Sequence, residues 1–253
     1  MKKLFLTSWI GGYDRSDEDK TPIKLNNTNR FVDRLRLACP NIRVITYIAS
    51  DPNDFEKCDE HSKRLMANLK LDGFEPEAIY VIDNRNRYNV ADAVMSSDIV
   101  FLSGGHVPTQ NAFFKKIALK EILQNYNGVV IGQSAGSMNC AELVYVQPEE
   151  PEDFADKDFK IQIAGLGLTK YNIMPHINFA KDYDYNGVTV YDMCMEDCKK
   201  IYHYGIVDGG FIEVENDGRS AVSYGETYLF REGNCRKLCD NGESIEVNIW
   251  YKH

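Results

Sequence analysis

Residues 128–139 read Gly-Val-Val-Ile-Gly-Gln-Ser-Ala-Gly-Ser-Met-Asn, and this stretch decides the fold. A β-branched apolar run leads into the pattern Gly-x-Ser-x-Gly, and residues compatible with a helix follow. This order predicts a nucleophile elbow, in which a strand turns sharply into a helix and holds Ser134 at the bend. Glycines suit the positions two residues before and two residues after Ser134, because the backbone segments approach each other closely there and Cβ atoms would clash. An ordinary strand-to-helix turn with a small residue at its tip is the alternative for this stretch alone.

The segments before this stretch alternate between apolar runs and amphipathic runs. Alternation of this kind, with several strands apolar throughout, predicts an α/β fold with a doubly wound, mostly parallel sheet. Ligands bind such sheets at the carboxyl ends of the strands, which is where Ser134 would lie. We predict strands at 4–7, 42–48, 77–82 and 98–102, and helices at 28–38, 51–71, 89–97 and 109–124.

The pattern changes after about residue 145. Residues 147–158 are acidic and contain prolines, which predicts an exposed loop, and residues 184–200 can form a helix. Short apolar runs follow, and from residue 209 they are expected to form C-terminal β-hairpins at one edge of the sheet. Nothing marks a domain boundary or a repeat, so we predict a single domain over residues 1–253. The expected strands of this part are 171–174, 201–207, 211–214, 221–224, 226–230 and 244–250.

Composition and charge narrow the class of protein. Hydrophobic residues make up 43% and charged residues 26% of the 253 residues, as in ordinary soluble globular proteins. The net charge of -9 argues against a nucleic-acid partner, because binding phosphates requires a basic stripe. The first ten residues look faintly like a signal peptide, but polar residues interrupt the short apolar run, which favours a strand. No run is long enough to span a bilayer, so we expect a cytoplasmic protein that contacts no membrane.

The seven cysteines are an odd number in a chain with no export signal, and we expect them to be reduced thiols. Two pairs with a spacing of four, Cys194 with Cys198 and Cys235 with Cys239, could together supply four thiolates to zinc. Structural zinc sites usually have the tighter Cys-x-x-Cys spacing, and nothing in the sequence brings these pairs together. Buried or incidental thiols are therefore the favoured interpretation.

A serine hydroxyl needs a base to remove its proton, and a histidine is the usual base. His176 follows Met174-Pro175 at the end of a predicted strand, so it is expected on the same rim as Ser134. His203 lies in the middle of a strand and is more typical of a core histidine. His61 is expected in a solvated helix and His253 at the mobile end of the chain, and the fifth histidine is His106.

The base works best when a carboxylate orients it, and Asp208 is the candidate for this role. It follows the predicted strand 201–207 and precedes a glycine pair, which places it on the same rim, although a turn aspartate would have the same surroundings. An oxyanion hole also requires backbone N–H groups aimed at the developing charge. Ala135, directly after the candidate nucleophile, can supply one, and the turn at Gly104-Gly105 can supply another.

These segments resemble the serine peptidase family of dipeptidase E (alpha-aspartyl dipeptidase) and cyanophycinase. The resemblance implies a flavodoxin-like, class I glutamine amidotransferase-like fold. It also implies that Ser134 is the nucleophile and His176 the general base. By the same resemblance Asp208 takes the place of the family's acidic residue, and Gly105 and Ala135 form the oxyanion hole. The matching segments are Phe101–Gly105, Gly132–Ser137, Asn172–His176 and Gly205–Ile212.

Two positions depart from the family pattern. The family commonly has Gly-Gly-Asn-Thr after the fourth strand, where this chain has Gly104, Gly105, His106 and Val107, so Gly104 and His106 are candidate substrate contacts. Asp208 stands where the best-known members have glutamate, which is longer by one methylene.

The leading hypothesis is a serine-type peptidase that hydrolyses small peptides or amides through an acyl-enzyme, with no metal or organic cofactor. A non-catalytic member of the amidotransferase-like fold, acting as a binding or regulatory protein, is the alternative. An α/β-hydrolase-type esterase fits less well, because there the acid precedes the histidine in the chain. A glutamine amidotransferase would need a cysteine at the elbow. The sequence leaves open whether an N-terminal aspartate is required and whether the protein is a monomer or a homodimer.

Overall fold

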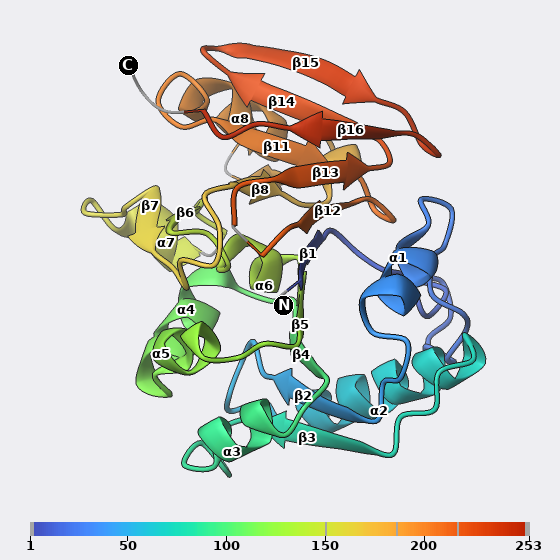
Figure 1. Ribbon diagram of the computed structural model, residues 1–253. Coiled ribbons are helices and arrows are strands. Elements are labelled where there is room, and N and C mark those ends of the chain that lie inside the picture. The colour runs from blue at the N-terminus through green and yellow to red at the C-terminus, as the bar shows by residue number, and fades with distance from the viewer. Residues whose placement is uncertain (1–2, 150, 186, 217, 251–253) are drawn as a thin grey trace.

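The computed structural model describes residues 3–149, 151–185, 187–216 and 218–250. Its centre is an eight-stranded sheet, in which five parallel strands form one side and three antiparallel strands the other (Figure 1). The parallel strands are β1 (Lys3–Thr7), β2 (Val44–Ile48), β3 (Ala78–Ile82), β4 (Ile99–Leu102) and β5 (Val129–Gln133). The antiparallel strands are β12 (Phe211–Val214), β13 (Ala221–Tyr224) and β16 (Ser244–Val247). The order across the sheet is β16-β13-β12-β1-β5-β4-β2-β3.

Helices cover both faces of this sheet, as a doubly wound fold requires. Figure 1 shows α1 (Phe31–Ala38) and α2 (Phe55–Leu71) on one face, and α4 (Val107–Lys116), α5 (Leu119–Gln124) and α6 (Ala135–Met138) on the other. The short α3 (Val90–Met95) links β3 to β4. The predicted fold class is therefore confirmed.

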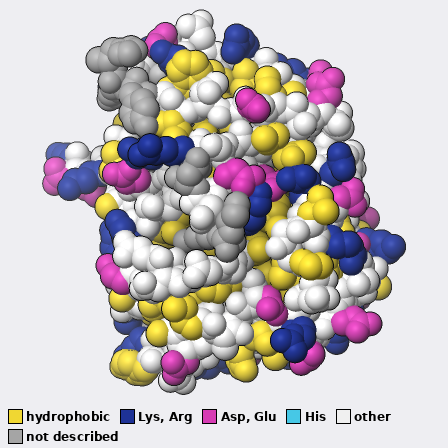
Figure 2. Space-filling view, in the orientation of Figure 1, with side chains coloured by type: hydrophobic (Ala, Val, Ile, Leu, Met, Phe, Trp, Pro, Cys, Tyr) yellow, Lys and Arg dark blue, Asp and Glu magenta, His cyan; other side chains and the backbone are white. Residues whose placement is uncertain are grey.

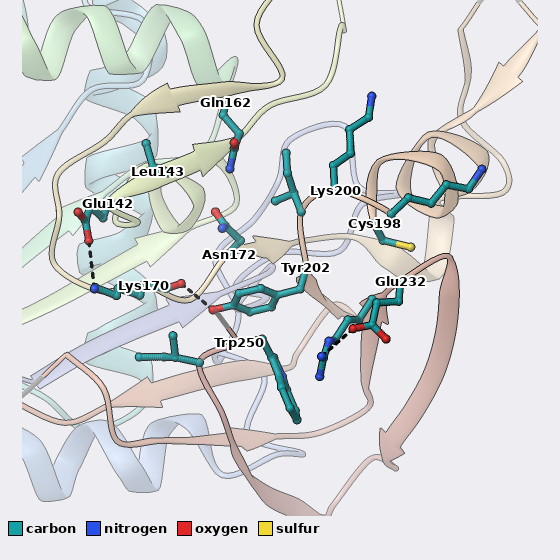
Figure 3. A pocket seen from close by; sticks show the side chains of 14 residues that line it. Glu142, Leu143, Gln162, Lys170, Asn172, Cys198, Lys200, Tyr202, Glu232 and Trp250 are labelled. Atoms are coloured by element: carbon teal, nitrogen blue, oxygen red, sulfur yellow. Dashed lines mark hydrogen bonds and ion pairs between the residues drawn. The ribbon is translucent and has the colours of Figure 1, made fainter. Parts of the chain in front are cut away.

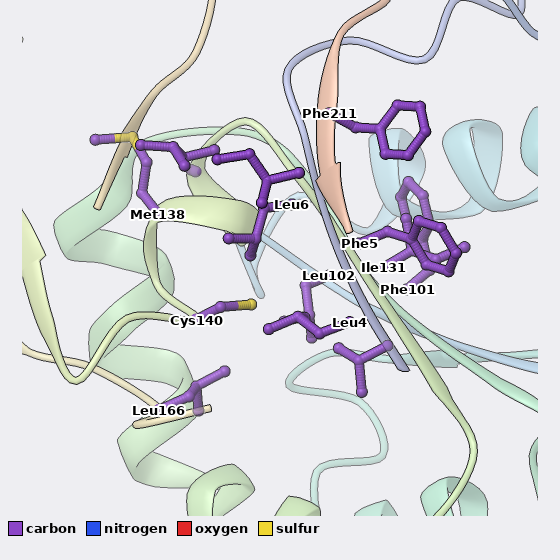
Figure 4. Close-up of a cluster of buried hydrophobic side chains, with 14 of the residues drawn as sticks. Leu4, Phe5, Leu6, Phe101, Leu102, Ile131, Met138, Cys140, Leu166 and Phe211 are labelled. Carbon is purple, nitrogen blue, oxygen red and sulfur yellow. The ribbon is translucent and has the colours of Figure 1, made fainter. Parts of the chain in front are cut away.

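The core follows from the alternation of side chains along the buried strands. Phe5 lies on one face, where its ring contacts Phe31 and Phe211 at centroid distances of 5.8 and 5.9 Å. Leu4 and Leu6 point to the opposite face, Leu6 toward Met138 and Leu4 toward Cys140 (Figure 4). The central strands are thus buried on both faces and form a rigid base for the residues at their carboxyl ends.

A second sheet of four strands lies beside the central one (Figure 1). We expected the C-terminal hairpins at one edge of a single sheet, and this expectation is only partly right. Strands β12, β13 and β16 do extend the central sheet, but β14 and β15 form a hairpin in the second sheet together with β8 and β11. The second sheet consists of β8 (Ile173–Met174), β11 (His203–Ile206), β14 (Thr227–Arg231) and β15 (Asn234–Cys239).

Three predicted segments differ locally from the structure. The helix expected at 109–124 is broken between α4 and α5, because Ala118 has a left-handed φ of 51°. The helix expected at 184–200 shortens to α8 (Val190–Asp197), which follows a hairpin of β9 (Asp184–Tyr185) and β10 (Val188–Thr189). The expected loop 147–158 contains α7 (Pro151–Ala155), and β6 (Leu143–Tyr145) and β7 (Gln162–Ala164) pair on either side of it. Its acidic residue Glu150 lies outside the described residues.

Two further observations concern the surface and possible membrane contact. On the face shown in Figure 2, Lys and Arg side chains are interspersed with Asp and Glu. In the part of the chain that the structure describes, no helix combines the length and the apolar character needed to cross a bilayer.

Candidate active site

Ser134 lies at a sharp bend between β5 and α6, with backbone angles φ 52° and ψ −117°. This is a costly conformation for a residue with a side chain, and the surroundings hold it in place. The backbone N–H of Ser134 donates to the carbonyl oxygens of Thr7 and Ser8 at 3.0 and 3.1 Å. A Cβ atom on Gly132 would lie 2.6 Å from the backbone nitrogen of Ser137, so only glycine fits there. β5 therefore turns directly into α6 at Ser134.

The structure brings the three candidate catalytic residues into contact. His176 Nε2 lies 3.0 Å from Ser134 Oγ, and His176 Nδ1 lies 2.6 Å from Asp208 Oδ1. Both distances are within hydrogen-bond reach, and the imidazole bridges the serine and the carboxylate. The shorter aspartate therefore reaches the histidine without the additional methylene of a glutamate.

The histidine and the aspartate come from the second sheet, whereas the serine comes from the central one. β8 and β11 are parallel neighbours, with Met174 opposite Gly205, so the residues that follow them lie close together. His176 follows β8 in a left-handed conformation with φ 57°, and Asp208 follows β11. The site therefore forms at the junction of the two sheets.

Ser8 and Arg15 complete the surroundings of Asp208, and the sequence analysis did not find either of them. Ser8 Oγ donates to Asp208 Oδ1 at 2.8 Å and accepts from the backbone N–H of His176 at 2.8 Å. Arg15 Nη2 donates to Asp208 Oδ2 at 2.5 Å. Burial acts to raise the pKa of Asp208, but the hydrogen bonds from His176 and Ser8 and the charges of His176 and Arg15 outweigh it. The pKa of Asp208 is therefore lowered, and the carboxyl stays ionised.

The Gly104-Gly105 turn lies against the elbow, as expected for part of an oxyanion hole. A Cβ atom on Gly104 would be 3.2 Å from the Cβ of Ser134 and 3.4 Å from the carbonyl oxygen of Gln133. β4 and β5 are parallel neighbours with Leu102 opposite Gly132, which places this turn and the bend at the same edge. Ala135 begins α6, so its N–H group belongs to the first turn of that helix.

A cavity of about 330 Å³ opens beside Ser134 and His176. Gly104 and Gly105 line it, as do Trp9, Tyr13 and Arg15 of the N-terminal segment. One face of α2 forms another wall, which carries Lys57, His61, Arg64, Leu65 and Asn68.

His61 was expected in a solvated helix, and this expectation is only partly right, because the side chain is half-buried. The residue lines the cavity, and burial and the nearby Arg64 charge lower the pKa of its imidazole to about 4. It is therefore neutral near pH 7. Its spacing of four from Lys57 and three from Arg64 places all three on one helix face, and this pattern was the available signal.

The remaining histidines lie elsewhere. His106 does not line the cavity: its Nδ1 lies 2.8 Å from Thr109 Oγ1 and its Nε2 lies 3.3 Å from Asp153 Oδ2, so these partners turn it toward α7. The proposed contact of His106 with substrate is therefore not supported by its position. His203 is fully buried and stacks between Tyr145 and Phe230, which agrees with its interpretation as a core histidine. His253 lies outside the described residues.

A larger groove of about 820 Å³ lies away from the three candidate catalytic residues (Figure 3). Trp250, Tyr202 and Lys170 are among its lining residues, and Lys170 pairs with Glu142 across 3.8 Å. None of Ser134, His176 and Asp208 lines it. The smaller cavity is therefore the one connected to the candidate chemistry.

The two cysteine pairs do not form a metal site in the described part of the chain. No group of three or more His, Cys, Asp or Glu side chains there could hold a metal ion. All seven cysteines are free thiols. Cys140, the cysteine nearest the elbow in sequence, donates its thiol to the carbonyl oxygen of Gly136 and is buried.

A doubly wound α/β sheet with a serine at a sharp strand-to-helix bend and an adjacent histidine and carboxylate is typical of a hydrolase-like class of protein. The sequence model of Peptidase family S51 matches residues 43–222, which is more than half of the chain. The protein therefore belongs to peptidase family S51, a family of serine peptidases, and the resemblance noted in the sequence is confirmed.

A solved structure agrees with this fold. It is the crystal structure of a provisionally assigned peptidase E from Listeria monocytogenes EGD-e, with a TM-score of 0.52 and 14% sequence identity. The match covers 94% of this chain and 98% of that one. No curated protein sequence matches the chain.

Proposed function

We propose that this protein is a serine peptidase that hydrolyses small peptides through an acyl-enzyme on Ser134. The observation that carries the proposal is the contact of His176 with both partners, at 3.0 Å from Ser134 Oγ and 2.6 Å from Asp208 Oδ1. A serine hydroxyl is a weak nucleophile by itself, and a base oriented by a carboxylate is what activates it.

In the first half of the reaction, His176 Nε2 accepts the proton of Ser134 Oγ as that oxygen bonds to the peptide carbonyl carbon. The carbonyl oxygen becomes an anion, which the N–H groups of Gly105 and Ala135 stabilise. Asp208 stabilises the imidazolium. The C–N bond then breaks, and His176 returns the proton to the departing amine, which leaves an ester on Ser134.

In the second half, water attacks the ester carbonyl and His176 accepts a proton from that water. The C–Oγ bond breaks, the proton returns to Ser134 Oγ, and the acid product leaves. Every step uses side chains and backbone groups of this chain, so the proposed reaction requires no metal or organic cofactor.

The charge of the cavity favours a substrate that carries a carboxylate. Arg15 is paired with Asp208, Arg64 is paired with Glu60 at 2.8 Å, and His61 is neutral near pH 7. Lys57 has no ion-pair partner among the described residues and lines the same wall. We therefore expect the cation of Lys57 to attract a negatively charged group of the peptide.

Two measurements test the proposed activity. A fluorophosphonate probe should label the native protein and should not label Ser134→Ala, because the probe reacts only with an activated serine. Peptides that differ only by Glu against Gln, or Asp against Asn, should show higher kcat/KM for the acidic member. Absence of labelling, together with no cleavage of either peptide set, would favour a non-catalytic binding protein.

The cellular compartment, the domain organisation and the partners are part of the same proposal. We place the enzyme in the cytoplasm, where its seven cysteines would stay reduced, as they are in the structure. We also propose that residues 1–253 act as one domain, since β12, β13 and β16 complete the sheet that begins with β1. The expected partner is the peptide substrate, and we expect no nucleic acid and no membrane.

A further inference from the structure

The segment between β1 and α1 is a folded loop that packs on α2. Gly11 forms a β-bridge with Leu25, which closes the loop at its base. The buried side chain of Asn68 donates to the carbonyl oxygens of Gly12 and Ile23, at 2.7 Å each. These contacts hold loop 11–30 in one position, and with it the side chain that the loop carries into the site.

That side chain is Arg15, and three groups fix its guanidinium. Nη2 donates to Asp208 Oδ2 at 2.5 Å. The guanidinium carbon lies 4.2 Å from the centre of the Trp9 ring and 5.1 Å from the centre of the Phe179 ring. Cation–π contacts of this kind favour a planar guanidinium in a fixed orientation.

The two rings belong to the segments that carry the other partners of Asp208. Trp9 directly follows Ser8, and Phe179 ends the 3₁₀ turn Ile177–Phe179 that follows His176. Arg15 therefore contacts both of the segments that carry the other partners of Asp208. Two aromatic contacts and a hydrogen bond to the carboxylate together indicate that the guanidinium of Arg15 has a fixed position.

We propose that Arg15 is a positioning residue of the active site: it holds the second oxygen of Asp208, so that the first faces His176, and it shares the charge of that carboxylate. The kinetic part of this inference rests on the proposed peptidase function. The electrostatic part does not, because it concerns only the proton on His176.

The sign of the electrostatic effect follows from the charges that face the pair. Asp208 stabilises a protonated His176, and the Arg15 cation opposes this by neutralising the carboxylate and by repelling the imidazolium. The other cations of the cavity, Lys57 and Arg64, act in the same direction as Arg15. Ser8, Ser134 and neutral His61 carry no charge near pH 7. Removing Arg15 should therefore make His176 easier to protonate, and its titration midpoint should rise.

The test is an NMR titration of the His176 ring in the wild-type protein and in the variants Arg15→Met, Arg15→Lys and Lys24→Met. The signal is assigned by its loss in His176→Gln. For Arg15→Met we expect the midpoint to rise by roughly 0.5–1 pH unit, since the pair is partly exposed to solvent. For Arg15→Lys, which keeps the charge but not the planar fork, we expect less than half of this rise.

Lys24→Met is the matched control, because it removes an exposed cation from the same loop at a position that does not line the cavity. Its midpoint should equal that of the wild type. Circular dichroism checks that each variant is folded, and Arg15→Gln replaces Arg15→Met if the latter is not. An unchanged midpoint in the folded variant would overturn the inference.

A kinetic measurement distinguishes this failure from failure of the proposed function. With an active wild-type enzyme, the acid limb of the kcat/KM profile should move upward in Arg15→Met together with the NMR midpoint, and kcat should fall. A change in KM alone, with the limb unmoved, would overturn the inference and assign Arg15 to substrate binding. An inactive, unlabelled wild type would contradict the peptidase proposal, while the NMR titration would still decide the electrostatic effect.

Discussion

The central sheet and the second sheet contribute to the site in different ways. The central sheet supplies Ser134 from the end of a buried strand, and the bend there is held by its own glycines and by hydrogen bonds to the carbonyl oxygens of Thr7 and Ser8. The second sheet supplies His176 and Asp208 from the ends of β8 and β11, and β8 has only two residues. A local sequence pattern marks the bend at Ser134, and contacts with the neighbouring β1 help to hold this serine. Its partners reach it only when the two sheets are docked together.

The largest effect is expected at Ser134, the proposed nucleophile in the central sheet. Ser134→Ala should lower kcat/KM by at least about 10³-fold, because the attacking oxygen is removed and little else changes. The melting temperature should stay within a few degrees. Ser137→Ala is the matched control: its hydroxyl donates to the carbonyl oxygen of Thr7 at 2.8 Å, so it should lose stability but keep activity. Retained hydrolysis in Ser134→Ala would refute the nucleophile assignment.

A loss nearly as large is expected when the second sheet loses His176, the proposed base. His176→Ala should lower kcat/KM by about 10³-fold or more, because members of a triad act as a unit. His203→Phe is the control, since the new ring can stack between Tyr145 and Phe230 in the place of the imidazole. The comparison measures kcat/KM of the two variants at equal concentrations of folded protein. If the His203 variant were the inactive one, the base would be assigned wrongly.

The elbow itself should be sensitive to one added methyl group. Gly132→Ala places a Cβ 2.6 Å from the backbone of Ser137, and we expect a loss of about 3 kcal/mol in the free energy of unfolding. Gly242→Ala is the comparison, because that glycine has φ 84° but no atom within 4 Å of an added Cβ. It should cost only about 1 kcal/mol, from backbone strain. Urea unfolding measures both, and equal losses would show that crowding at the elbow is unimportant.

The smallest effect is expected from the charge of the Asp208 carboxylate, which follows β11 in the second sheet and accepts a hydrogen bond from Ser8, after β1 of the central sheet. The folded-state pKa of Asp208 lies below its ordinary value of 3.8, so its ionised form stabilises the folded state. This contribution is present above the ordinary pKa and is lost as the pH falls through the lower, folded-state pKa. The difference in unfolding free energy between the wild type and Asp208→Asn should be fully present at about pH 5. It should shrink below about pH 4.

Urea titrations at several pH values measure this difference. A gap that is as large at pH 3 as at pH 5, or one that widens between these two values, would mean that Asp208 is not held in its ionised form by Arg15, Ser8 and His176.

Sequence reasoning recovered most of the central sheet. The parallel strands are apolar throughout and separated by amphipathic helices, and such patterns are local. It failed at two places outside these strands. The continuous helix expected at 109–124 breaks at Ala118, and the hairpins expected at one edge divide between two sheets. In both cases the local residue pattern allows either arrangement.

The same division holds for the site. The spacing of residues identified Ser134, and position after predicted strands singled out His176 and Asp208, which the structure brings together. Neither spacing nor position after a strand selects Ser8 or Arg15. Neither residue lies in a motif, and both contact Asp208, about 200 positions away along the chain. The cavity wall of α2 was visible only as a spacing of basic residues, which a solvated helix would share.

By itself, then, the sequence determined the doubly wound sheet, the elbow and the strain at Ser134. The signals for them are local: β-branched runs form buried strands, and glycines permit a tight bend. Only the tertiary structure decided that His176 and Asp208 reach the serine from another sheet, that Ser8 and Arg15 hold the carboxylate, and that α2 lines the cavity. These contacts join segments distant in the chain, and their geometry is set by the packing of whole sheets and helices.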